Sequence, residues 1–133
     1  MPKEVSEGTA QRLLRIARAA RRRAYAPYSR FRVGAAVLAA DGSVYTGCNV
    51  ENGSYGLSVC AERVAVQKAV SEGQRRVVAV AVAGPQGTEL LPCGACRQVL
   101  LEFRVRFVVT AGRGRLRIYR MEELLPQPFR RPE

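Results

Sequence analysis

The most informative stretches of this sequence are Cys60-Ala61-Glu62 and Pro92-Cys93-Gly94-Ala95-Cys96. The second stretch contains a C-x-x-C step, in which two thiolates from one turn of backbone can bind a single metal ion. A third thiolate from Cys60 would complete three protein ligands. Three ligands with an open fourth position are typical of a catalytic zinc site, whereas a structural site is closed. The chain has no histidine, so a transition-metal site must be built mainly from sulfur, which favours zinc over copper, nickel or non-heme iron.

Length and composition indicate one compact domain over residues 1–133. A chain of this length buries about two-thirds of its surface on folding, and 47% of its residues are hydrophobic. No run of 18 apolar residues and no signal-peptide core are present, so we expect a soluble cytoplasmic protein without membrane contact. Four cysteines could form two disulfides, but a C-x-x-C beside a proline favours metal binding.

The net charge of +11 is carried by arginine, because Lys3 and Lys68 are the only lysines among the 22 basic residues. Such a charge can indicate nucleic-acid binding, since basic side chains neutralise phosphates. The arginines are scattered along the chain, however, and the densest run, Arg21-Arg22-Arg23, has no interleaved aromatic residue. We therefore interpret the charge as a solvated or subunit-contact surface.

Hydrophobic periodicity predicts alternating helices and strands. Apolar residues at helical spacing predict an amphipathic helix over residues 9–24, which Pro27 stops. Further helices are expected over 60–72 and 94–103, with a last helical turn at 122–125. Strands are expected over 31–39, 43–50, 77–83, 106–111 and 116–119, the first two joined by a hairpin turn at Asp41-Gly42. This order predicts an α/β fold with a five-stranded mixed sheet covered by helices.

Other polar residues are candidates for the site. Asn49 and Glu51 are two apart in a predicted strand, so their side chains should face the same side and could receive sugar hydroxyls. Cys48 should then face the opposite side, and we interpret it as a small buried hydrophobic residue and not as a fourth ligand. Arg97 and Gln98 follow the last cysteine and are either support for the site or ordinary helix surface.

Five blocks, in order, give the chain a family resemblance. They are Ala26 to Ala36, Gly47 to Asn52, Cys60 to Arg63, Pro92 to Gln98 and Glu122 to Pro126. Together they resemble the small cytidine deaminases that act on free nucleosides, in the three-cysteine form of the zinc-deaminase signature. The resemblance extends from about Tyr25 to Phe129. It implies a three-layer α/β/α sandwich and one Zn²⁺ per chain, held by Cys60, Cys93 and Cys96.

The resemblance also implies roles for individual residues. Glu62 would shuttle protons during hydrolysis of cytidine and 2′-deoxycytidine to uridine and 2′-deoxyuridine, with release of ammonia, in pyrimidine salvage. Three thiolates leave a net charge of −1 on the zinc site, and the arginine matching Arg63 hydrogen-bonds ligand sulfurs in relatives. The resemblance further implies that Asn49 and Glu51 bind the ribose, that Phe31 packs on the base, and that Ala61 and Glu62 contact the edge of the pyrimidine. It also implies a homotetramer in which Tyr55 and Phe129 contribute to the pockets of neighbouring subunits.

Two other functions remain open at the level of sequence. A related deaminase could act on a base within a polynucleotide or on a nucleoside antibiotic of the blasticidin type. The carboxylate of Glu51 argues against a polynucleotide, because it would repel a 3′-phosphate, and the blasticidin-type relatives have no acid at that position. A non-catalytic zinc-stabilised binding module is the third alternative, but it would have no need of Glu62 beside a ligand. Nothing in the sequence ranks cytidine against deoxycytidine.

Overall fold

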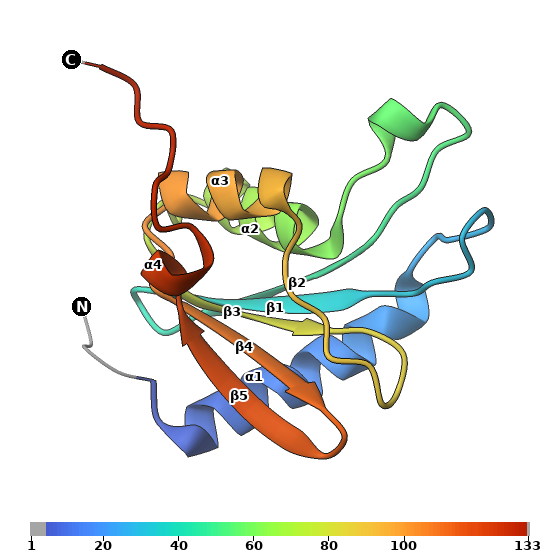
Figure 1. The fold of residues 1–133 in the computed structure, drawn as a ribbon, viewed down its shortest axis with the longest axis horizontal. Helices are drawn as coiled ribbons and strands as arrows, with labels where there is room; N and C mark the ends of the chain where they lie inside the picture. Colours follow the sequence, from blue (N-terminus) through green and yellow to red (C-terminus); the bar gives the residue numbers. More distant parts are fainter. Residues whose placement is uncertain (1–4, 133) are drawn as a thin grey trace.

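The computed structural model describes residues 5–132 and consists of one mixed sheet with helices on both faces (Figure 1). All the helices and strands expected from the sequence are present, with bounds shifted by a few residues. The helices are α1 Glu7–Ala20, α2 Ala61–Ser71, α3 Gly94–Glu102 and α4 Met121–Leu124, with short 3-10 turns η1 Arg21–Arg23 and η2 Tyr55–Leu57. The strands are β1 Gly34–Ala39, β2 Val44–Cys48, β3 Val77–Ala83, β4 Phe107–Gly112 and β5 Arg115–Arg120.

The sheet has the strand order β2-β1-β3-β4-β5. β3 and β4 are parallel, while all other neighbours are antiparallel, so the prediction of a mixed sheet is confirmed. A parallel pair needs a crossover connection, and here α3 provides it. This crossover carries the second cysteine stretch over the sheet.

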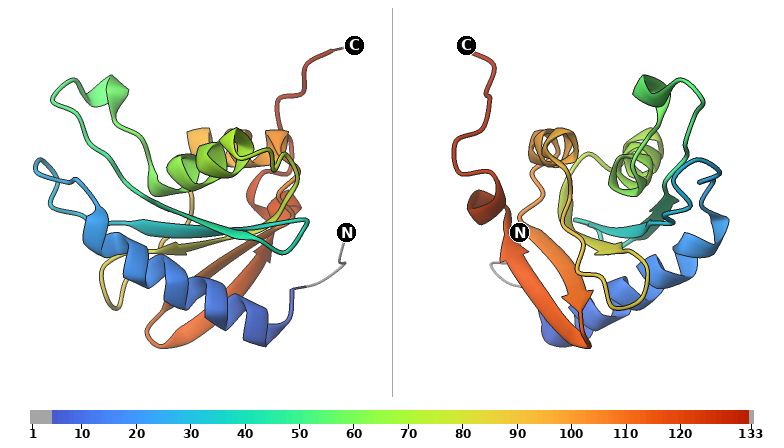
Figure 2. Two further views of the ribbon diagram at one scale, coloured as in Figure 1. Left: turned by 180° about the vertical axis from the view of Figure 1, so that it is seen from behind. Right: turned by 45° about the vertical axis from the view of Figure 1, so that its right-hand side comes forward.

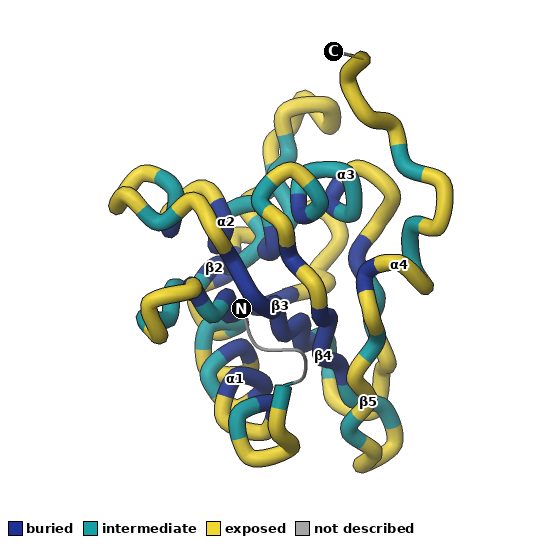
Figure 3. Tube along the Cα trace, turned by 90° about the vertical axis from the view of Figure 1, so that its left-hand side faces the viewer, coloured by how far each residue is buried: buried dark blue, intermediate teal, exposed yellow. Residues whose placement is uncertain are grey.

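The two faces of the sheet bury different side chains. Along β3, Val80 and Val82 pack with α2 and α3, whereas Ala79 and Ala81 pack with α1. A strand that is buried on both faces has no polar alternation, which explains the continuous apolar run Val77–Ala83. The two further views show α1 on one face and α2 with α3 on the other, and the buried segments lie between these layers (Figures 2 and 3). The expected three-layer α/β/α arrangement is therefore confirmed.

The start of α2 lies directly on β2. A β-carbon at Gly47 would press against the carbonyl oxygen of Ala61 and would lie 2.5 Å from the amide nitrogen of Ala65. Only glycine permits so close an approach of helix and strand backbones. This contact fixes the first turn of α2, with Cys60 and Glu62, relative to the sheet.

Two strand predictions were too long. β1 begins at Gly34, so Phe31 lies in the preceding loop, and β2 ends at Cys48, so Asn49 and Glu51 lie beyond the strand. The reason is that both polar side chains bond to that loop, while Val50 forms only isolated bridges to Tyr25 and Val59. Cys48 is partly exposed, which corrects the expectation of a buried residue. Among residues 5–132 no helix has the length and apolarity needed to span a bilayer.

Candidate metal centre

Three cysteine sulfurs meet where α2 and α3 begin. Cys60 and Cys93 are the N-cap residues of these helices, and Cys96 is the third residue of α3. The three Sγ atoms all lie within 4.8 Å of one another, and those of Cys60 and Cys93 are 3.9 Å apart. Tetrahedral zinc with Zn–S bonds of about 2.3 Å places its sulfurs roughly 3.8 Å apart. The cluster therefore fits a zinc ion. Cys48 is not part of it.

The surroundings of the cluster stabilise negative charge. The hydrogen bond from the Cys96 thiol lowers the pKa of Cys60 to about 5, with further help from Arg63, and the same hydrogen bond raises the pKa of Cys96. The N-terminal ends of two helices add partial positive charge. These surroundings favour the thiolate form of Cys60, which is the form that binds a divalent metal ion.

Arg63 is the cation next to this cluster. Its Nη2 atom lies 3.6 Å from the Cys60 sulfur, and this hydrogen bond raises the pKa of the guanidinium. Its Nε atom is buried and has no hydrogen-bond partner in the described chain. Burying an unpaired donor costs free energy. The attraction between the guanidinium and the cysteine sulfurs offsets this cost and holds Arg63 in place.

Glu62 is a buried acid at the same helix end. Only 4% of its surface is exposed, and burial raises the pKa of its carboxyl to about 7, with a further contribution from the charge of Cys60. A carboxyl group with a pKa near the ambient pH can both accept and deliver a proton. The structure thus brings a proton-transfer group and a candidate metal site together within one turn of α2.

Asn49 and Glu51 hold the loop that precedes β1. Asn49 accepts a hydrogen bond from the Val33 amide at 2.8 Å and donates one to the Phe31 carbonyl at 2.9 Å. Glu51 accepts hydrogen bonds from the amides of residues 28 and 29 at 3.0 and 3.2 Å, and from the Ser29 hydroxyl, which lowers the pKa of Glu51. Both side chains are therefore turned toward the same loop. Sequence reasoning missed Ser29, although it lies within the quoted Ala26 to Ala36 block.

The backbone of Phe31 is held by hydrogen bonds with Ser29 and Asn49. Its ring lies close to Gly84, where an added β-carbon would be 3.7 Å from the ring, and 37% of the residue is exposed. Gly84 opens the segment that leads from β3 to Pro92 and Cys93. Ala61, in contrast, is fully buried in the first turn of α2. The loop with Phe31 and the segment entering the cysteine stretch are thus neighbours.

Tyr55 and Phe129 do not meet within one chain. Both are largely exposed, at 76% and 69%. The ring of Tyr55 meets that of Tyr28 edge-on, with centroids 6.1 Å apart. The η2 segment and the C-terminal segment lie on opposite sides of the layer formed by α2 and α3 (Figures 1 and 2).

Comparison with known proteins agrees with this geometry. A family model described as the cytidine and deoxycytidylate deaminase zinc-binding region matches residues 7–111. A cytidine deaminase of Halalkalibacterium halodurans is 49% identical over 122 residues, covering 90% of this chain and 92% of that protein. A crystal structure of cytidine deaminase from Burkholderia pseudomallei aligns with a TM-score of 0.85 and 45% identity, over 94% of this chain and 100% of that one. The chain belongs to the zinc-dependent cytidine and deoxycytidylate deaminase family.

The metal site makes a direct prediction. Replacement of Cys60 by alanine removes one of three converging sulfurs, so the purified variant should retain well under one zinc per chain after dialysis against a weak chelator, as measured by elemental analysis. Cys48→Ala is the matched control and should keep about one zinc per chain. Full zinc content in Cys60→Ala would show that this sulfur is not a ligand.

Proposed function

We propose that this chain hydrolyses cytidine and 2′-deoxycytidine to uridine and 2′-deoxyuridine, releasing ammonia, as a cytoplasmic enzyme of pyrimidine salvage. The observation that carries the proposal is the buried Glu62 beside three converging sulfurs. We assign Cys60, Cys93 and Cys96 as the ligands of one Zn²⁺ per chain, and residues 1–133 as a single deaminase domain.

Glu62 is proposed to move every proton of the reaction. Zinc held by the three sulfurs supplies a nucleophile at neutral pH, because it lowers the pKa of bound water from near 16 to about 7. Glu62 takes a proton as water adds to C4 of the pyrimidine and delivers it to ring N3. It then passes the second proton to the departing amine, so that cytidine and water become uridine and ammonia. Burial of this carboxyl suits it to both directions of transfer.

Arg63 and the helix ends are proposed to balance the charge of the thiolates. Three thiolates around a divalent ion carry a net charge of −1, which opposes deprotonation of water. The guanidinium of Arg63 beside Cys60 offsets part of this charge. The N-terminal ends of α2 and α3 act in the same sense.

The substrate contacts are proposed from the loop that precedes β1. Asn49 and Glu51 would receive the ribose 3′-hydroxyl, and their bonds to this loop orient both side chains before substrate arrives. Phe31 would pack on the base, while Ala61 and Glu62 would bind the edge of the pyrimidine. A carboxylate at the 3′-position favours a free nucleoside and disfavours nucleic acid, since a 3′-phosphate would be repelled.

We further propose a homotetramer whose pockets are shared between subunits. Tyr55 and Phe129 are exposed aromatic residues, and the η2 turn and the C-terminal segment that carry them lie at opposite sides of the helix layer (Figure 1), so each would complete a pocket of a neighbouring chain. Large exposed apolar side chains are typical of interaction surfaces. Tyr28, whose ring contacts that of Tyr55, and Leu57, in the same η2 turn, are also exposed and extend this apolar surface.

The role of Glu62 is tested by Glu62→Gln, which keeps the shape of the side chain but cannot accept a proton. We expect kcat to fall by about 10²–10⁴-fold or more, while zinc content stays near one per chain. Glu72→Gln, at the exposed end of the same helix, is the control and should keep parental activity. The assignment fails if Glu62→Gln turns over cytidine at a rate near that of the parent.

Substrate choice is tested by ultraviolet absorbance loss on cytidine, deoxycytidine, blasticidin S and a short cytosine-containing oligonucleotide. The two free nucleosides should be deaminated, whereas the oligonucleotide should not react. Glu51→Gln should lower kcat/KM for cytidine roughly tenfold or more, since hydrogen bonds to a charged group are worth about 1.5–3 kcal/mol. Preference for the oligonucleotide or for blasticidin S would contradict the proposed substrate.

Assembly is tested by size-exclusion chromatography with light scattering. The parent should run with a mass near four chains. Tyr55→Ser should weaken assembly and lower activity together, whereas Ile118→Ser, which changes an exposed apolar residue on β5, should do neither. A fully active monomer would contradict the shared pockets.

A further inference from the structure

Arg97 joins two backbone carbonyls that are far apart in sequence. Its Nε atom donates to the carbonyl of Pro92 at 2.8 Å, and its Nη1 atom donates to the carbonyl of Leu124 at 2.7 Å. The planar guanidinium can donate in two directions from one rigid group. One side chain thus connects the residue before Cys93 with the last residue of α4.

The hydrogen bond from Arg97 to the Pro92 carbonyl lies next to Cys93, a proposed zinc ligand. The backbone amide of Arg97 also donates to the carbonyl of Cys93, at 2.9 Å. Arg97 therefore holds both carbonyls that flank the Cys93 nitrogen and α-carbon, one through its side chain and one through its backbone. Cys93 itself is exposed, and its side chain makes no cap to α3. These two bonds hold the backbone on both sides of the Cys93 α-carbon, from which its sulfur projects.

The Leu124 bond connects this turn to the C-terminal part of the chain. α4 has only four residues, so the carbonyls at its end have few partners within the helix. Gln98, the next residue of α3, donates to the carbonyl of Phe129 at 2.9 Å. Two consecutive side chains of α3 thereby hold the segment that runs from α4 to Phe129.

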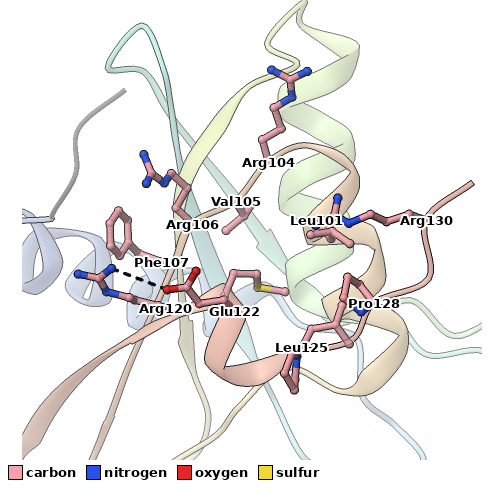
Figure 4. A pocket seen from close by; sticks show the side chains of 12 residues that line it. Leu101, Arg104, Val105, Arg106, Phe107, Arg120, Glu122, Leu125, Pro128 and Arg130 are labelled. Carbon is pink, nitrogen blue, oxygen red and sulfur yellow. Dashed lines mark ion pairs between the residues drawn. The ribbon is translucent and has the colours of Figure 1, made fainter.

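The surface between these parts contains a hollow. A hollow of about 470 Å³ lies where the end of α3, α4 and the C-terminal segment meet, with Leu101, Met121, Leu125 and Pro128 among its lining residues (Figure 4). Side chains separated by such a space make fewer dispersion contacts. Beside this hollow, Leu100 of α3 and Met121 of α4 belong to one buried core cluster, and the polar bonds of Arg97 add a second connection between the two helices.

We propose that Arg97 is a positioning residue, which fixes the Cys93–Cys96 turn by anchoring it to α4. It touches neither substrate nor metal, and acts through the Pro92–Cys93 peptide. The inference rests on the proposed zinc ligands, but not on the identity of the substrate. Partners that orient a metal ligand in this way change metal affinity or activity by about 10–100-fold when removed.

The test compares two variants. Arg97→Met removes the guanidinium donors but keeps an aliphatic side chain, whereas Arg97→Lys keeps the positive charge but cannot donate to both carbonyls from one planar group. Arg12→Met, an exposed arginine of α1 on the opposite face of the sheet, is the matched control. Zinc release to an excess of a coloured chelator is followed well below the unfolding temperature of each variant. Turnover and KM for cytidine are measured in parallel.

Arg97→Met should release zinc about tenfold faster or more and lose turnover, while KM stays within about twofold. Arg97→Lys should fall between this variant and the parent, and Arg12→Met should match the parent. If Arg97→Met releases zinc at the same rate as the parent, the proposal is overturned, even if the variant unfolds at a lower temperature. If Arg97→Met does not fold, parental zinc release in Arg97→Lys overturns it. A parent chain that binds no zinc would refute the ligands themselves, and the inference with them.

Discussion

The convergence of two helix N-termini on one face of the sheet is the constraint on which the site depends. α2 follows the loop after β2, and α3 is the crossover between the parallel strands β3 and β4, so both helices lie on the same layer. Their N-cap residues are cysteines, and Cys96 follows within one turn. The close approach of Gly47 to α2 fixes one of these helix ends, and the bonds of Arg97 fix the other. Three sulfurs can therefore converge without a disulfide or a histidine.

Electrostatics follow from this convergence. Three sulfurs at this spacing cannot all be ionised without compensating positive charge, and the guanidinium of Arg63 beside Cys60 provides part of it. The same helix end buries Glu62, which raises the pKa of its carboxyl. The three converging sulfurs and the buried Glu62 carboxyl beside them are thus consequences of a single local arrangement.

Much of this was predictable from the sequence, because it depends on local patterns. Periodicity predicted the helices and strands, and the spacing of Cys60, Cys93 and Cys96 predicted the sulfur cluster. Contacts between distant segments have no such pattern. The bond from Arg97 to Leu124 spans 27 residues, so the sequence left this side chain undecided between support and surface. Strand periodicity likewise placed Asn49 and Glu51 in a strand, whereas β2 ends at Cys48. Periodicity carries no information on the side-chain hydrogen bonds to the neighbouring loop that end the strand here.

The central claim is an ion bound by three sulfurs with one position left for water. X-ray absorption at the zinc edge of the purified protein measures this directly, since it counts sulfur and lighter neighbours and gives their distances. The account predicts about one zinc per chain, with three sulfurs at about 2.3 Å and one oxygen at about 2.0–2.2 Å. A shell of four sulfurs would indicate a closed structural site, and either that result or the absence of zinc would contradict the account.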